Sequence, residues 1–176
     1  CIPMLQRTLG TLPRSIKLMF HVKHTPIEKL TPRGWIDLGE KFGVNICLAD
    51  ALKVKNPVLS ELGECMFTGE LESETDIHDF AKLAKKNLDC KGLRYTDIKD
   101  RVKKVAVSSG AGGSNVFDAA LAGVDVLVTG EIEHHEIIAA NSLGIDIIDA
   151  GHFKSEDIVI LPLVNKLSKE FSEIVF

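Results

Sequence analysis

The 176-residue sequence lacks several features that would assign it quickly to a functional class. It has no excess of positive charge, and with a formal net charge of −4 it offers no electrostatic argument for nucleic-acid or anionic membrane partners. It has no secretory signal pattern and no apolar run of about 18 residues. Its four cysteines are scattered, without a Cys-x-x-Cys pair, which favours free thiols in a reducing, cytoplasmic setting.

Three apolar, β-branched runs stand out in the second half of the chain, within residues 105–114, 124–131 and 145–156. Each run ends in a glycine-bearing turn, and helical patterns separate them. This rhythm predicts a parallel sheet covered by helices, so we expect an α/β fold with helices on both faces of a mixed sheet. Ligands of such sheets usually bind beyond the C-terminal strand ends, where the polar residues cluster.

The weaker patterns predict the remaining elements. We expect strands around residues 65–69 and 93–96, and helical structure within residues 35–54, where Asn45 could cap a second piece. An amphipathic helix should start at Ser73 or Thr75. Later helices should cover residues 116–122, with Ser114 as N-cap, and residues 132–142, and a last one should begin near Pro162. Residues 173–176 could form a closing strand.

Two histidine–glutamate pairs have the spacing of a metal half-site. His152 and Glu156 are four residues apart, so both side chains point the same way if the chain turns helical after Gly151. Imidazole and carboxylate together suit a divalent metal such as Zn, Fe or Mn. His24 and Glu28 repeat the spacing. The structural alternative for His152 and Glu156 is a strand-end histidine beside a helix-opening glutamate, and the alternative for His24 and Glu28 is a solvated surface loop.

Two further stretches are candidates for chemistry. Of the adjacent His134 and His135 at a helix opening, at most one should face a site, and we favour His135. The turn containing Gly110, Gly112, Gly113 and Ser114 could hold an anion on its backbone N–H groups, or could simply be a tight turn. It approaches a dinucleotide fingerprint, but Asn115 stands where the third glycine belongs. Asp149 could orient His152 or cap a turn.

In combination these motifs resemble the Nif-three-like dinuclear-metal family, whose members are often named GTP cyclohydrolase 1 type 2 homologues. The stretches that carry the likeness are Thr68-Gly69-Glu70-Leu71, residues 105–114, Thr129-Gly130-Glu131 with His135, and Asp149-Ala150-Gly151-His152 with Ser155-Glu156. The resemblance implies a two-metal site between two α/β lobes, and ring-shaped homo-hexamers.

The resemblance also implies which residues bind metal. His152 and Glu156 match the C-terminal motif. The stretch from His24 to Glu28 resembles a His-Thr-x-x-Asp motif in which Glu28 replaces the aspartate. The family's upstream His-His pair is absent, so we expect residues 1–56 to be the remnant of an incomplete N-terminal lobe and residues 57–176 to form the C-terminal lobe. We expect an in-frame His-His pair upstream of Cys1.

The sequence therefore predicts a metal-dependent hydrolase acting on a nucleotide-like or phosphorylated small molecule. His152, Glu156 and Glu28 would hold a divalent ion (Zn, Fe, Mn or Mg), His135 would act as acid or base, and Gly110, Gly112, Gly113 and Ser114 would hold a phosphate. The expected partners are the small-molecule substrate and further copies of the chain. The competing hypotheses are a non-enzymatic metal-binding or interaction protein, and a dinucleotide-binding domain, which would leave His152 and Glu156 unexplained.

Overall fold

The three apolar runs form the central strands of a sheet. The structure, a computed structural model, describes residues 42–171 and residue 175. In it β4 (Arg101–Ser108), β5 (Val126–Thr129) and β6 (Asp146–Asp149) lie side by side and run parallel. β5 and β6 are buried along their whole length, which explains why apolar residues stand next to each other in both strands rather than alternating with polar ones: Val126 to Val128 in β5, and Ile147 and Ile148 in β6.

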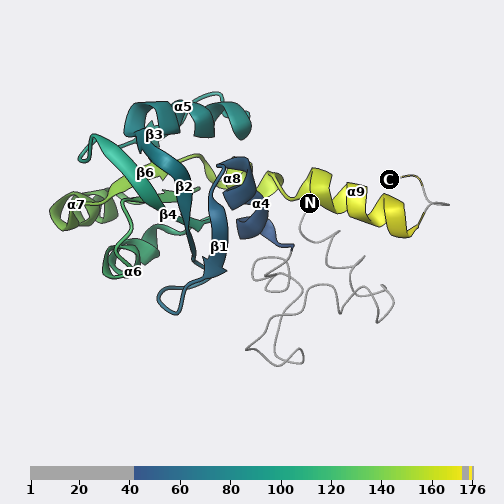
Figure 1. Ribbon diagram of the computed structural model, residues 1–176, viewed down its shortest axis with the longest axis horizontal. Helices are drawn as coiled ribbons and strands as arrows, with labels where there is room; N and C mark the ends of the chain where they lie inside the picture. Colours follow the sequence, from purple (N-terminus) through teal and green to yellow (C-terminus); the bar gives the residue numbers. More distant parts are fainter. Residues whose placement is uncertain (1–41, 172–174, 176) are drawn as a thin grey trace.

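Three antiparallel strands extend this parallel core. β1 (Lys55–Leu59) pairs with β2 (Phe67–Asp76), which pairs with β4, and the two-residue β3 (Arg94–Tyr95) pairs with β6 at the other edge. The strand order is β1-β2-β4-β5-β6-β3 (Figure 1). The expected mixed sheet is thus confirmed.

Helices cover both faces of the sheet, as expected. On one face α4 (Val44–Ala51) and α5 (Ile77–Asn87) pack in one apolar cluster with inward side chains such as Val105, Val128 and Ile148. On the other face α6 (Val116–Leu121) and α7 (His134–Leu143) pack with Leu127 and Ile147. Neighbouring residues of one strand therefore serve opposite cores, which is the period-two alternation of a pleated strand.

The last two helices follow β6 directly. α8 (His152–Asp157) begins immediately after Gly151, which meets the condition set for the His152–Glu156 spacing, and α9 (Ile160–Glu170) contains Pro162 in its first turn. Val159 and Leu163 pack against Val44 and Cys47 of α4 in a third, smaller apolar cluster. Beyond that contact α9 extends away from the sheet (Figure 1).

Several local predictions were wrong. β2 runs on to Asp76, through residues expected to open a helix, and α5 starts only at Ile77 with Asp76 as its N-cap. Asn45 does not cap α4; Gly43 precedes the helix, and the Asn45 side chain instead accepts a hydrogen bond from Ser109 N–H. Ser114 lies within a 3-10 turn, Gly113–Asn115, rather than at a helix N-cap.

The expected division into residues 1–56 and 57–176 stays a prediction, because residues 1–41 lie outside the described part. Within that part, β1 crosses the expected boundary, and Leu48 and Leu52 share the main apolar cluster with the sheet. Across residues 42–171, no helix has the length and apolarity needed to cross a membrane.

Cys47 and Cys90 are buried thiols, and Cys65 is half-buried. Burial, followed by the nearby charge of Asp50, raises the pKa of Cys47 to about 11. The Cys47 thiol therefore remains protonated at neutral pH and behaves as a small apolar side chain in the α4–α9 cluster.

Asp125 joins the starts of the three parallel strands. Its carboxylate accepts hydrogen bonds from Lys99 Nζ at 2.6 Å and from the backbone N–H groups of Lys104 at 2.8 Å and Lys103 at 3.0 Å. Burial, which disfavours the charged form, is outweighed by these bonds, so the pKa of Asp125 lies below its usual value.

We predict that Asp125→Asn lowers the free energy of unfolding by about 1–2 kcal/mol at neutral pH. We expect no larger loss, because the carboxylate is partly exposed and solvent screens its interactions. Because the folded-state pKa is lowered, this stabilisation is present above about pH 4 and is lost as the pH falls through the folded pKa. Urea unfolding at a series of pH values measures it, with the exposed Asp97→Asn as the matched control. An equal loss in both variants would contradict the assignment.

Candidate functional site

The C-terminal ends of β4, β5 and β6 converge because the parallel register sets Ser108 beside Thr129 and Thr129 beside Asp149. The turns that follow are bonded to one another. Gly130 N–H donates to Gly110 O at 3.0 Å, and Ala150 N–H donates to Thr129 O at 2.9 Å. Glu131 and His152, which are 21 residues apart in sequence, are thereby brought to the same edge of the sheet.

Two glycines allow the turns to approach this closely. Gly110 has φ +67°, and a Cβ there would lie 2.7 Å from Glu156 Oε1 and 3.3 Å from His152 Nε2. A Cβ on Gly130 would lie 2.8 Å from His152 Cα and 3.0 Å from Gly110 O. Gly110 therefore lets the His152 and Glu156 side chains lie against its turn, and Gly130 lets the backbone of the three turns approach.

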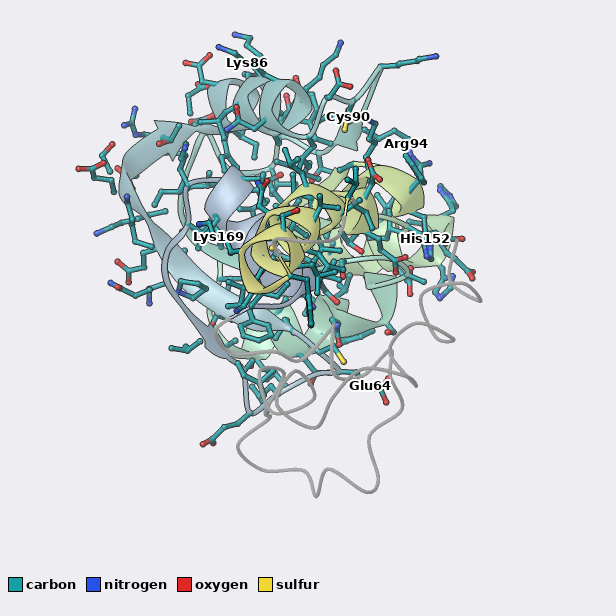
Figure 2. All side chains as sticks on the ribbon, turned by 90° about the vertical axis from the view of Figure 1, so that its right-hand side faces the viewer. Glu64, Lys86, Cys90, Arg94, His152 and Lys169 are labelled. Atoms are coloured by element: carbon teal, nitrogen blue, oxygen red, sulfur yellow. The ribbon has the colours of Figure 1, made fainter. Side chains whose placement is uncertain are left out.

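His152 lies between two carboxylates. Its Nδ1 is 2.9 Å from Glu131 Oε2, and its Nε2 is 3.5 Å from Glu156 Oε1. An ionised carboxylate can only accept a hydrogen bond, and Glu131 is the nearer of the two, so we assign the proton of the neutral imidazole to Nδ1, which leaves Nε2 unprotonated on the side of Glu156. The ring is about half exposed, on one side of the molecule (Figure 2). The i, i+4 pairing of His152 and Glu156 on α8 is the geometry that their spacing predicts.

Ser155 stabilises this arrangement from the buried side. Its side chain is fully buried, and its Oγ accepts from Gly110 N–H at 3.0 Å and donates to His152 O at 2.9 Å. Sequence reasoning gave no role to Ser155 and did not pair Glu131 with His152. The pairing of Glu131 with His152 could have been predicted, because adjacent parallel strands bring together the residues that follow their ends.

Asp149 does not orient His152 through its imidazole. It instead forms an ion pair with Arg94 of β3, and its Oδ1 accepts from Gly151 N–H at 3.0 Å. The expectation that Asp149 could cap a turn is the one that matches these contacts.

The other predicted site residues lie as follows. His135 is exposed, with Nδ1 3.3 Å from Glu133 Oε2, and its role as acid or base stays a prediction. His24 and Glu28 lie outside the described residues. In the residues that the structure describes, no group of three or more His, Cys, Asp or Glu side chains is arranged to hold a metal ion.

The glycine turn after β4 already uses much of its backbone. Gly110 N–H donates to Ser155 Oγ and Gly112 N–H donates to Thr129 Oγ1. A Cβ on Gly113 would collide with the carboxylate of Glu136, so a negative charge lies against this turn. The anion site of Gly110, Gly112, Gly113 and Ser114 stays a prediction, and these contacts do not favour it.

A family comparison supplies the remaining evidence. The family model described as Duf34/NIF3 (NGG1p interacting factor 3) matches residues 35–176. The chain belongs to the Duf34/NIF3 family.

Individual Duf34/NIF3 relatives agree. A protein named GTP cyclohydrolase 1 type 2 homolog from Clostridium perfringens is 34% identical over 120 residues, which cover 68% of this chain and 44% of that protein. A solved Bacillus cereus protein related to NIF3 is 33% identical, with a TM-score of 0.57, over 61% of this chain and 30% of its own. A Staphylococcus aureus hypothetical protein, 22% identical with a TM-score of 0.69 over 78% of this chain and 59% of its own, shares the fold. The chain spans less than half the length of the curated relative described above.

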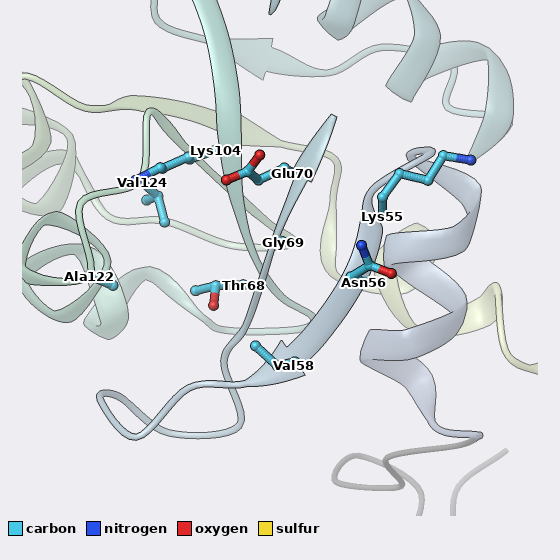
Figure 3. Close-up of a pocket in the computed structure, with 9 residues that line it drawn as sticks. All are labelled: Lys55, Asn56, Val58, Thr68, Gly69, Glu70, Lys104, Ala122 and Val124. Atoms are coloured by element: carbon cyan, nitrogen blue, oxygen red, sulfur yellow. The ribbon is translucent and has the colours of Figure 1, made fainter. Parts of the chain in front are cut away.

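A groove elsewhere on this Duf34/NIF3 chain is separate from the strand-end cluster. It has a volume of about 400 Å³ and crosses β1 and β2, where Val58, Thr68 and Glu70 line it together with Lys104 (Figure 3). Neither His152 nor Glu156 lines it. Within residues 42–171, the His152–Glu156 pair therefore lies at the strand ends and not in the groove.

We predict that Ser155→Ala destabilises the fold by about 1–3 kcal/mol, because it leaves Gly110 N–H buried without an acceptor. Ser142→Ala is the matched control: its hydroxyl donates to Ile138 O on an exposed helix surface, and its loss should change stability by no more than about 0.5 kcal/mol. Urea unfolding midpoints compare the two. Similar midpoints for both variants would show that Ser155 does not support the turn.

Proposed function

We propose that His152 and Glu156 are ligands of a divalent metal ion and that the whole protein is a metal-dependent hydrolase. The single observation that carries the proposal is the convergence of His152 Nε2 and Glu156 Oε1 beside Gly110. Membership of the Duf34/NIF3 family supports it.

The residues present fit such an ion. An imidazole nitrogen and a carboxylate oxygen are ligands that Zn, Fe and Mn accept, and Mg accepts the carboxylate. The two atoms are 3.5 Å apart, close enough to share one ion, and the missing side chain of Gly110 lets both groups lie against this turn. Glu131 holds the second ring nitrogen, which is the usual support of a metal-binding histidine.

The roles of the chain's own residues follow from these contacts. Glu131 fixes the tautomer and orientation of His152, Glu156 supplies the anionic oxygen, and Ser155 secures the turn against which both pack. A divalent ion bound there would lower the pKa of a bound water molecule and polarise the substrate group that the water attacks. Glu28 as third ligand and His135 as acid or base belong to the proposal on sequence grounds alone.

The substrate class rests on the relatives' names. The name GTP cyclohydrolase 1 type 2 homolog supports a nucleotide-like or phosphorylated small molecule as substrate. A cytoplasmic setting and assembly of the chain into homo-oligomers, with the ring-shaped hexamer as the expected form, complete the proposal.

We predict that the chain binds one divalent ion weakly, because the described part supplies only two ligands. His152→Ala and Glu156→Ala should each weaken binding of Zn²⁺ or Mn²⁺ strongly, and Glu131→Gln should weaken it about 10-fold through the orientation of His152. Isothermal titration calorimetry of the full chain measures the affinities.

Matched controls for these variants are His78→Ala and Glu72→Gln, which alter exposed side chains of the same types on α5 and β2. Binding unchanged in both His152→Ala and Glu156→Ala would place any metal site elsewhere. Two tightly bound equivalents in the parent chain would contradict the ligand count.

The enzymatic part of the proposal needs its own test. Nucleoside triphosphates should be turned over by the whole protein in the presence of Mn²⁺ or Zn²⁺, and the His152→Ala variant should lose that turnover. Metal binding without turnover of any triphosphate would favour the alternative, a non-enzymatic metal-binding or regulatory protein.

Self-association is a separate prediction. Phe117 and Leu121 lie one turn apart on α6 and are 60% and 75% exposed, and Phe153 and Leu161 are exposed on α8 and α9. Such apolar surface favours contact between copies. Light scattering at micromolar concentration should give a mass above the 19.3 kDa of one chain. A monomer would contradict this prediction.

A further inference from the structure

The guanidinium group of Arg94 spans two of the strand-end turns. Its Nε lies 3.1 Å and its Nη2 2.5 Å from Asp149 Oδ2, at the end of β6. The same Nη2 donates to Ile132 O at 3.3 Å, in the turn after β5. One side chain on the edge strand β3 therefore connects the turn that carries Glu131 to the turn that carries His152.

The contact with Asp149 continues to the start of α8. While Oδ2 of Asp149 binds Arg94, its Oδ1 accepts from Gly151 N–H. Gly151 has φ +85° and immediately precedes His152. The Asp149 side chain is only 9% exposed, so its direction is fixed by these partners. Arg94 thus constrains the backbone from which the His152 side chain projects.

The contact with Ile132 restrains the turn that carries Glu131, the partner of His152. Ile132 follows Glu131, whose carboxylate holds His152 Nδ1. A movement of this turn away from β6 would lengthen that 2.9 Å contact. By binding both turns, Arg94 fixes the distance between Glu131 and His152 without touching either side chain.

The segment before β3 also contacts the turn that carries His152 and the helix that follows this turn. Cys90 Sγ donates to Ala150 O at 3.3 Å, and Asp89 Oδ2 lies 3.3 Å from Lys154 Nζ. Cys90, Arg94 and His152 lie along one side of the molecule (Figure 2). Of these contacts only that of Arg94 reaches the Glu131 turn as well.

We propose that Arg94 is a positioning residue for the metal-binding histidine: it sets the Glu131–His152 pair by joining the two turns that present it. The proposal rests on the proposed function in that His152 binds a metal ion. Lysine cannot replace Arg94 fully, because the Asp149 and Ile132 contacts use two nitrogens of one planar fork.

The test compares two arginines with the same kinds of partner. Arg101 also donates to a carboxylate and a backbone carbonyl, Oε2 and O of Glu74, but at the opposite end of β4. We expect Arg94→Gln to raise the Kd for Co²⁺ about 10-fold and to shift the visible absorption of the bound ion. The Kd of Arg94→Lys should lie between those of the parent chain and Arg94→Gln. Arg101→Gln should leave the Kd within about twofold and the spectrum unchanged.

Thermal unfolding of both variants identifies a general loss of stability. Equal effects of Arg94→Gln and Arg101→Gln on Co²⁺ affinity, or an unchanged spectrum in Arg94→Gln, would overturn the proposal while leaving the metal site in place. Absence of Co²⁺ binding by the parent chain would instead count against the proposed function.

A metal-independent measurement decides the role of Arg94 in that case. Long-range ¹H–¹⁵N correlation spectra at about pH 8.5, where an ordinary imidazole is neutral, report which ring nitrogen of His152 carries the proton. The Nδ1–H form should predominate in the parent chain and in Arg101→Gln, and its share should fall in Arg94→Gln. An unchanged tautomer in Arg94→Gln would overturn the proposal.

Discussion

The parallel register of β4, β5 and β6 is the constraint on which the site depends. It sets Ser108, Thr129 and Asp149 in one row, so the three following turns must meet at one edge. They can meet only because Gly110 and Gly130 carry no side chain, since a Cβ on Gly130 would lie 2.8 Å from the His152 backbone. The positions of His152, Glu131 and Glu156 are therefore consequences of strand pairing and turn chemistry together.

The strongest patterns in the sequence predicted this core correctly, and the reason is physical. β5 and β6 are buried on both faces, so Val126 to Val128 and the pair Ile147 and Ile148 are apolar and mostly β-branched, and a glycine follows each strand within two residues. β2 was mistaken in part because Glu72, Ser73 and Glu74 are all exposed and have a polar composition typical of a helix start. Pairing with β4 resumes at Thr75 and Asp76 after an irregularity, and this tertiary effect cannot be predicted from local propensity.

The candidate site divides in the same way. The pairing of His152 with Glu156 follows from a spacing of four on one helix and was predicted. The partners of Asp149 could not be predicted. A short strand around Arg94 was expected, but its local sequence does not indicate that it pairs antiparallel with β6 and brings Arg94 to Asp149. Sequence spacing thus identifies contacts within one element, whereas contacts between elements depend on a strand order that has to be seen.

The balance of charge at the strand ends argues for a cation there rather than an anion. Glu131 and Glu156 both face His152, and Glu136 lies against Gly113 in the turn that a phosphate would occupy. Arg94 is paired with Asp149, so it adds no uncompensated positive charge. The N–H groups of Gly110 and Gly112 are already donors to side-chain hydroxyls. An anion would have to displace these bonds and approach like charges, whereas a divalent ion between His152 and Glu156 would reduce the repulsion among the carboxylates.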